Sequence, residues 1–281
     1  MVFVQCGTSN ELVVSDGLRF NESTLPYGDA LLVANFGCEQ LNPLNTDGKG
    51  YISIYKDGKL STFIPNDGAL SAPKGMLIKD NHLLICDVNK VVVYDLGDLG
   101  RAPQVVRFPD GELFVNDIVS IGDEVFVSVT NSGNIFKLDG SDVATISMQL
   151  PYKWFNIVGA NGLAVDDNAL FVASYPADGV TTAANVIYVI EDVNSPVAFM
   201  LTTKAGQWDG LAVSDDKKTL YASSWSPAEV VAISLESGDI QTLDIATEFV
   251  GAADFSLVGD TLYIPDLPNS KLIIVKDWVC K

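Results

Sequence analysis

A unit of four β-like segments recurs along this chain, and it narrows the range of folds more than any other property of the sequence. Its two best-matched copies are NGLAVDDNALFVASY (161–175) and DGLAVSDDKKTLYASSW (209–225), each followed by an apolar run. The polar residues that open the six copies are Asp16, Lys74, Asp117, Asn161, Asp209 and Asp254. A repeat of roughly 45 residues is the length of one four-stranded propeller blade.

The residue types within each unit favour strands. Val, Ile, Tyr and Phe dominate the runs between Asp-Gly, Asn-Gly and Asp-Asp turns, and no stretch keeps a helical apolar period over three turns. We therefore predict an all-β chain that forms one six-bladed β-propeller domain over residues 1–281. Because the last unit ends at KLIIVK (271–276), the segment ELVVS (11–15) is expected to complete the last blade and close the ring.

The charge of the chain excludes one large class of partners. With 17 Lys and Arg against 36 Asp and Glu, its formal charge is −19, whereas a nucleic-acid binder needs clustered basic side chains.

No run of 18 apolar residues is present, so we expect no membrane span. The single histidine, His82, has no nucleophile or second ligand beside it and no G-x-S-x-G motif occurs, so serine-hydrolase chemistry is not expected.

The four cysteines bear on ring closure and on location. Cys6 precedes the first predicted strand and Cys280 follows the last, so a Cys6–Cys280 disulfide would tie the ring together; two free thiols are an equally good interpretation. Cys86 is expected in the core, and Cys38, in a loop, is left open. Residues 1–15 lack the features of a signal peptide, and the cysteines favour an exported protein, periplasmic or extracellular, whose leader has been removed, over a cytosolic one.

Oxygen donors dominate the residues that open the repeats. In a propeller the innermost strands start from one face, so these residues are expected to ring the mouth of the central channel. Four of them are Asp and one is Asn, and Asn116 lies next to Asp117. Crowded carboxylates repel one another unless a cation neutralises them, and oxygen ligands suit Ca²⁺, Mg²⁺ or Mn²⁺. The pattern predicts one divalent cation at the channel mouth; the alternative is that each residue only caps a turn.

Four short segments, in blade order over nearly the whole chain, carry a family resemblance. They are SDGLRF (15–20), FVNDI (114–118), ANGLAV (160–165) and WDGLAV (208–213). These segments resemble the ligand-bearing strand starts of the gluconolactonase/regucalcin (senescence marker protein) family. The resemblance implies a six-bladed propeller that holds one divalent metal at its channel mouth and hydrolyses a lactone.

The resemblance also implies roles for individual residues. The implied metal ligands are Asp16, Asn161 and Asp209, with Asp16 at a position where the family has Glu. Asp209 would also act as the catalytic general base. The substrate-contacting segment of the family falls on residues 114–117, where Asn116 and Asp117 match and Phe114 takes the place of an Arg.

One lysine and two tryptophans complete the predicted site. Lys74, at the channel mouth, would contact a substrate or balance the acidic residues, unless it is a solvated turn lysine. The loop residues Trp154 and Trp225 would form substrate-binding walls, although aromatic side chains in loops more often serve packing.

The first hypothesis is a metal-dependent hydrolase of a small-molecule substrate, which would be a lactone, a related ester or a sugar derivative. Ca²⁺ is the cation expected first, with Mg²⁺, Mn²⁺ or Zn²⁺ as alternatives. The second hypothesis is a non-catalytic NHL-type propeller whose loop face binds a protein or a glycan. The third is a propeller that binds metal without turnover. The fold does not choose among them, because one fold serves many functions.

Overall fold

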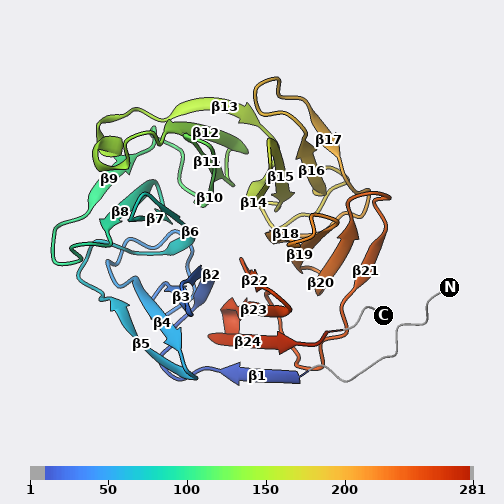
Figure 1. Cartoon of the computed structure of the whole chain (residues 1–281), viewed down its shortest axis with the longest axis horizontal. Helices are drawn as coiled ribbons and strands as arrows, with labels where there is room; N and C mark the ends of the chain where they lie inside the picture. Colours follow the sequence, from blue (N-terminus) through green and yellow to red (C-terminus); the bar gives the residue numbers. More distant parts are fainter. Residues whose placement is uncertain (1–9, 279–281) are drawn as a thin grey trace.

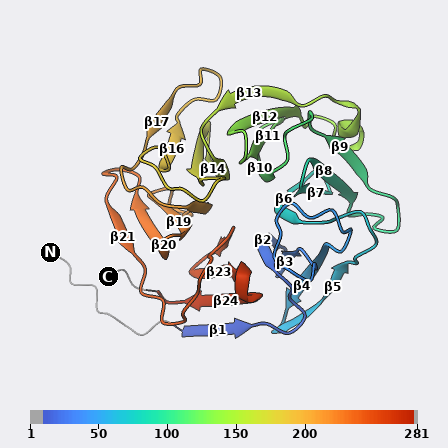
Figure 2. The same ribbon diagram turned by 180° about the vertical axis from the view of Figure 1, so that it is seen from behind.

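The computed structural model describes residues 10–278, whose regular secondary structure is almost wholly β-strand. The strands form six four-stranded antiparallel sheets that lie as blades around a common axis (Figure 1). Seen from behind, the same ring shows its opposite face (Figure 2). The predicted all-β, six-bladed propeller is therefore confirmed. No helix between residues 10 and 278 is long and apolar enough to cross a membrane.

Each of the first three blades uses four consecutive strands, counted from the axis outwards. Blade 1 consists of β2 (Asn21–Tyr27), β3 (Ala30–Asn35), β4 (Tyr51–Lys56) and β5 (Lys59–Ile64). Blade 2 consists of β6 (Pro73–Lys79), β7 (His82–Asp87), β8 (Lys90–Asp95) and β9 (Gln104–Arg107). Blade 3 consists of β10 (Val115–Ile121), β11 (Glu124–Val129), β12 (Asn134–Asp139) and β13 (Tyr152–Asn156).

Blades 4 and 5 repeat this order, and two short 3₁₀ helices lie in connections. Blade 4 consists of β14 (Ala160–Asp166), β15 (Ala169–Ser174), β16 (Ile187–Ile190) and β17 (Ala198–Met200). Blade 5 consists of β18 (Trp208–Val213), β19 (Thr219–Trp225), β20 (Ala228–Ser234) and β21 (Ile240–Thr242). The helices are η1 (Val143–Met148) and η2 (Leu267–Asn269).

Blade 6 is built from both ends of the described chain. Its inner strands are β22 (Ser256–Val258), β23 (Thr261–Asp266) and β24 (Lys271–Lys276), and its outer strand is β1 (Asn10–Val14). Strand β1 pairs with β24 from Asn10 opposite Lys276 to Val14 opposite Leu272. The predicted closure by the N-terminal strand is confirmed. Cys6 and Cys280 lie outside the described residues, so their disulfide stays a prediction.

Apolar side chains fill the space between neighbouring blades. One cluster packs Leu84 of blade 2 against Val125 of blade 3, and the fully buried Cys86 belongs to it, as expected for a core residue. Cys38 is buried in a second cluster beside Phe36, and both cysteines are free thiols. Because such interiors are close-packed, each blade holds its neighbour in a fixed position around the axis.

The innermost strands of blades 1 to 5 share one irregularity close to their first residue. Their pairing with the second strand shifts between Asn21 and Ser23, Pro73 and Met76, Val115 and Ile118, Ala160 and Leu163, and Trp208 and Leu211. The residues passed over at these shifts include Glu22, Lys74, Asn116, Asn161 and Asp209. A bulge of this kind turns a side chain out of the regular alternation of the strand. Each of blades 1 to 5 thereby contributes one such side chain at the same position.

Glycines beside these side chains let the inner strands approach one another closely. A Cβ atom on Gly162 would lie 1.8 Å from the backbone oxygen of Asp209, and one on Gly210 would lie 2.7 Å from the Cα atom of Asp254. A larger residue at either position would therefore displace the neighbouring blade. The Gly that follows Asn161 and Asp209 in the repeats serves interblade packing.

Blade 1 begins later than the sequence predicted. Residues 15–20, expected as the start of an inner strand opened by Asp16, instead form turns and bends between β1 and β2. Gly17 has a φ of +88° and Phe20 one of 50°, values that extended strands do not adopt. Strand β2 starts at Asn21, so the residue of blade 1 that matches Lys74 of blade 2 is Glu22.

Candidate functional site

A cavity of about 390 Å³ opens where the irregular ends of the inner strands meet. Its floor consists of Glu22, Lys74, Asn116, Asn161 and Asp209, one residue from each of β2, β6, β10, β14 and β18. All five floor side chains are buried. Its aromatic wall consists of Phe36, Phe114, Tyr175 and Trp225. The cavity volume lies near the lower end of the roughly 300–1,000 Å³ of small-molecule sites.

Three oxygen atoms of the cavity floor lack a hydrogen-bond partner among residues 10–278. They are Glu22 Oε2, Asn161 Oδ1 and Asp209 Oδ1. Buried polar atoms are nearly always paired, so three unpaired oxygens on one cavity require an explanation. Carboxylate and amide oxygens are ligands for a hard divalent cation, and these three fit such an ion.

The amide of Asn161 is essential to that fit. Within the described part of the chain, no three His, Cys, Asp or Glu side chains are grouped so that they could hold a metal ion. The two carboxylates of the cavity floor therefore need a neutral oxygen donor as their third partner. Asn161 supplies that donor without adding a further negative charge to a buried site.

Burial perturbs the acids around the cavity floor. Loss of hydration raises the pKa of Asp117 and of Asp209 to about 7. Burial, followed by repulsion from neighbouring acids, raises the pKa of Glu22 and of Asp254 well above their usual range. Lys74 opposes the shift of Glu22, but the effect of burial is larger, and burial also lowers the pKa of Lys74 itself. The metal-free site is thus a cluster of acids that resists ionisation.

We expect the metal-free protein to become less stable as the pH rises from about 4 to about 7. A carboxyl whose pKa is higher in the folded than in the unfolded chain keeps its proton longer in the folded state, so deprotonation in this interval favours unfolding. Each such carboxyl lowers the free energy of unfolding by roughly 1.4 kcal/mol per pH unit between its two pKa values. Denaturant unfolding of chelator-treated protein at pH 5 and pH 7.5 measures the effect.

The variant Asp209→Asn is the control for this pH dependence. It removes one carboxyl whose pKa is raised to about 7, so its stability should fall less steeply over the same interval. A wild-type protein whose stability rises between pH 5 and pH 7.5, or a variant with an unchanged slope, would contradict the expectation.

Trp225 holds Asp209 in place. The indole Nε1 of Trp225 donates a hydrogen bond of 2.7 Å to Asp209 Oδ2, and this bond opposes the rise in the pKa of Asp209. The Trp225 ring in turn meets Tyr175 edge-on, with 6.1 Å between the ring centroids. One oxygen of Asp209 is therefore fixed to the aromatic wall, and the other, Oδ1, is free for a ligand or a proton.

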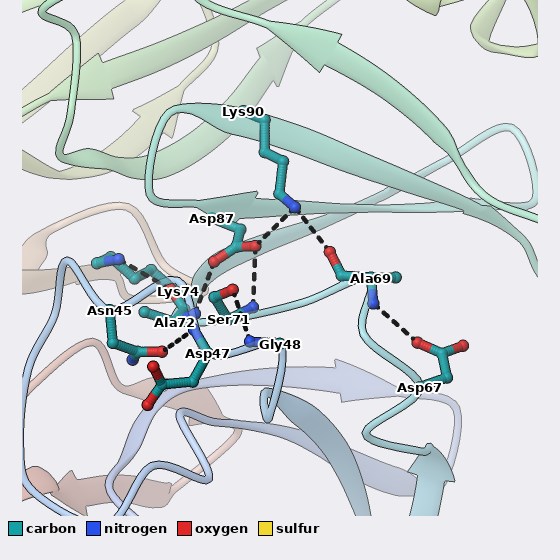
Figure 3. Close-up of polar contacts among 10 residues, drawn as sticks. All are labelled: Asn45, Asp47, Gly48, Asp67, Ala69, Ser71, Ala72, Lys74, Asp87 and Lys90. Carbon is teal, nitrogen blue, oxygen red and sulfur yellow. Dashed lines mark hydrogen bonds and ion pairs between the residues drawn. The ribbon is translucent and has the colours of Figure 1, made fainter.

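Lys74 is held by a separate network, drawn in Figure 3. Its Nζ donates a 2.8 Å hydrogen bond to the carbonyl of Ala72, and the backbone N–H groups of Ser71 and Ala72 donate to the buried carboxylate of Asp87 (Figure 3). Lys90 Nζ lies 3.3 Å from the same carboxylate. The loop that carries the acceptor for Lys74 is thus fixed to blade 2, and the ammonium group with it.

The structure brings together most of the predicted site residues. Those that line the cavity are Lys74, Asn116, Asn161, Asp209 and Trp225. Three predicted positions are wrong. Asp16 is exposed in the turn before β2, and the carboxylate that its blade contributes to the cavity is Glu22. Trp154 lies on the outer strand β13, where its ring packs 4.8 Å from that of Phe126.

Asp117 is the third correction. It was predicted as a substrate contact, but it does not line the cavity. Its two carboxylate oxygens accept hydrogen bonds from the backbone N–H groups of Ile118, at 2.7 Å, and Leu163, at 2.6 Å. Asp117 therefore ties blade 3 to blade 4. Asp254, which precedes β22 of blade 6, has a related role, because its Oδ2 accepts a 2.7 Å hydrogen bond from the hydroxyl of Ser23 on β2 of blade 1.

Glu22 and two wall residues were not among the predicted site residues. A signal for Glu22 was present, because the interval from Asp16 to Lys74 is the longest between any two successive repeat-opening residues, and it shortens when Glu22 replaces Asp16. Phe36 and Tyr175 follow β3 and β15 directly, at the cavity end of these strands. Aromatic residues are common at strand ends, so nothing in the sequence set these two apart.

No family model matches the sequence, and no curated protein matches it. A gluconolactonase from Xanthomonas campestris has a TM-score of 0.70 at 15% identity, with 96% of this chain and 90% of that chain covered. A protein provisionally described as a gluconolactonase has a TM-score of 0.69 at 15% identity, with coverages of 98% and 94%. A virginiamycin B lyase from Staphylococcus aureus has a TM-score of 0.57 at 11% identity, with coverages of 96% and 99%. The chain thus resembles gluconolactonase propellers in its fold.

Proposed function

We propose that this propeller is a hydrolase of a lactone or a related ester, and that it works with a divalent cation, Ca²⁺ first among those expected. The observation that carries the proposal is the convergence of Glu22 Oε2, Asn161 Oδ1 and Asp209 Oδ1, three buried oxygens without partners, on one cavity. The likeness in fold to gluconolactonases supports it.

The cation would be held by Glu22, Asn161 and Asp209. When bound, it would supply Lewis acidity that polarises the acyl carbonyl and lowers the pKa of water. Asp209 takes the proton of the attacking water, whose oxygen forms a bond to the acyl carbon. The bond from that carbon to the ring or ester oxygen then breaks, and the proton passes to the leaving oxygen. A lactone yields a hydroxy acid.

Other cavity residues orient the reacting groups. Trp225 fixes Asp209 Oδ2, so that Oδ1 keeps one direction toward the cavity. The Lys74 ammonium and the Asn116 amide are donors on the cavity floor for the acyl oxygen. The buried site keeps bulk water away from these groups, which strengthens each polar interaction with the substrate.

Two alternatives receive less support. A lyase reaction is suggested by the virginiamycin B lyase, of which a variant with His replaced by Ala is described as catalytically inactive. The single His82 of this chain begins β7, its Nδ1 lies 2.7 Å from the carbonyl of Asp80, and it does not line the cavity. A non-catalytic NHL-type binding propeller would leave the three unpaired oxygens of the cavity floor unexplained.

The test combines stability with turnover. The protein is treated with a chelator and unfolded by heat, alone and with Ca²⁺, Mg²⁺, Mn²⁺ or Zn²⁺, and each form is then assayed for hydrolysis of a lactone panel. A cation at 100 times its dissociation constant adds about 2.7 kcal/mol to the free energy of unfolding. In a chain of this size that raises the melting temperature by about 5 °C.

The two measurements separate the three hypotheses. A specific cation that both stabilises the protein and supports lactone hydrolysis is the expected result. Stabilisation without hydrolysis of any lactone or ester would favour a metal-binding propeller without turnover. If no cation shifts the melting temperature, the metal-dependent hydrolase is wrong, and the loop face becomes the place to look for a binding partner.

A further inference from the structure

The geometry points to a substrate whose lactone or ester group carries an apolar substituent, rather than a polyhydroxylated sugar ring. This inference rests on the proposed hydrolase function and names the substrate class of that site. The acyl group would lie on the cavity floor, and the substituent would lie against the aromatic wall.

The cavity separates polar from apolar groups. The cavity floor carries all of its buried charged and amide side chains, whereas the aromatic wall continues into Leu41, Pro43 and Leu267. The one polar atom of the Trp225 ring, Nε1, is already bonded to Asp209. A sugar ring against this surface would lose the water bound to its hydroxyls and would find few partners beyond the Tyr175 hydroxyl and the exposed carboxylate of Asp178, and each unpaired buried hydroxyl is costly. An alkyl or aryl substituent would instead gain from burial there.

Lys74 gives the cavity a direction. Its ammonium group lies 5.3 Å from the ring centroid of Phe36 and 5.2 Å from that of Phe114. Lys74 Nζ therefore lies at the border between the cavity floor and the aromatic wall. An ammonium group has three donors, and Ala72 accepts one of them. If a second N–H of Lys74 donates to the carbonyl oxygen of the substrate, the acyl group lies beside Lys74 and the substituent lies over the Phe114 ring.

Phe114 is the residue that decides this preference. It is only partly buried, and it lies immediately before the inner strand β10, so its ring forms part of the accessible surface of the cavity. An Arg at this position would bring five donors into the aromatic wall. The variant Phe114→Arg should therefore convert an apolar binding surface into a polar one.

The experiment compares γ-lactones with alkyl substituents of increasing length, from γ-valerolactone to γ-heptalactone, with D-glucono-δ-lactone, at saturating Ca²⁺. We expect kcat/KM of the wild type to rise about fourfold for each added CH₂, the ratio that corresponds to roughly 0.8 kcal/mol. D-Glucono-δ-lactone should be the poorest substrate. The rise with chain length should be lost in Phe114→Arg and weakened in Phe114→Ala. The control Phe199→Arg, at a 53% exposed position on β17, should match the wild type.

A binding series distinguishes failure of this inference from failure of the proposed function. Calorimetry with the matching γ-lactams, which resist hydrolysis, reports the same dependence on chain length without turnover. If the lactams bind more tightly with each CH₂ but no lactone is hydrolysed, the apolar cavity is supported and the hydrolase is wrong. A flat lactam series, or D-glucono-δ-lactone as the best substrate of an active enzyme, would overturn the inference. So would an equal response of Phe114→Arg and Phe199→Arg.

Discussion

Replacing Asp209 with Asn should lower kcat for lactone hydrolysis by a factor of about 10²–10⁴, the usual contribution of a positioned general base. The carboxylate is buried, its pKa is raised to about 7, and its Oδ1 has no partner among the described residues. Asn keeps the shape and one oxygen donor, but it cannot accept the proton of water. Steady-state kinetics at saturating cation measure the loss.

Two further variants identify the cause of that loss. Trp225→Phe removes the 2.7 Å hydrogen bond to Asp209 Oδ2 and part of the ring contact with Tyr175 but leaves the Asp209 carboxylate in place, so kcat should fall by about tenfold or less. Asp16→Asn changes an exposed carboxylate outside the cavity and should leave kcat unchanged. If Asp209→Asn keeps kcat within about fivefold of the wild type when the cation is saturating, Asp209 is not the general base.

Replacing Glu22 with Gln should abolish most of the stabilisation that a divalent cation gives. Glu22 is buried on the cavity floor, and its Oε2 is one of the three unpaired oxygens. Cation affinity in proteins depends on the number of charged ligands. If the dissociation constant rises about 100-fold, a concentration that adds about 2.7 kcal/mol to the wild type adds only about 0.4 kcal/mol to the variant. Thermal unfolding with and without Ca²⁺ measures both values.

Asp16→Asn is the matched control for Glu22→Gln. The two carboxylates are six positions apart in the sequence, but Asp16 is exposed in a turn and Glu22 lines the cavity. The Asp16 variant should keep the full cation-dependent rise in melting temperature. Equal losses in both variants, or a loss only in the Asp16 variant, would show that the cation binds elsewhere. Glu22→Gln alone should not destabilise the metal-free protein, because it removes a buried carboxyl that resists ionisation.

The architecture could be predicted because it depends on pattern rather than on detail. Six repeats of similar length, of which the last is one strand short, and an extra strand before the first repeat leave few arrangements other than a closed ring. Asn161 and Asp209, which the repeat pattern set apart, both line the cavity; each is the second residue of an inner strand and precedes a Gly that approaches the neighbouring blade closely. At these positions local pattern and site geometry coincide.

The errors arose where a turn and a strand start have the same composition. Asp16-Gly17 has the same letters as Asp209-Gly210, but Gly17 adopts a φ of +88° in an exposed turn. The local sequence does not indicate whether an Asp-Gly pair forms an exposed turn or the start of an inner strand, because contacts with distant residues decide between them. Trp154 and Asp117 show the same limit. Trp154 packs on Phe126 from an outer strand, and both carboxylate oxygens of Asp117 accept hydrogen bonds from backbone N–H groups.

The way blade 6 is completed determines when this protein can finish folding. During synthesis β1 leaves the ribosome before all other described strands, and its partner β24 leaves last. At translation rates of 5–20 residues per second, β1 waits roughly 15–50 s for that partner. Blades 1 to 5 can each pair their own strands as they emerge, whereas the sixth must wait until β24 has emerged. Closure of the ring is therefore a late event, and until then the nascent chain carries an unpaired strand with the apolar side chains of Leu12 and Val13.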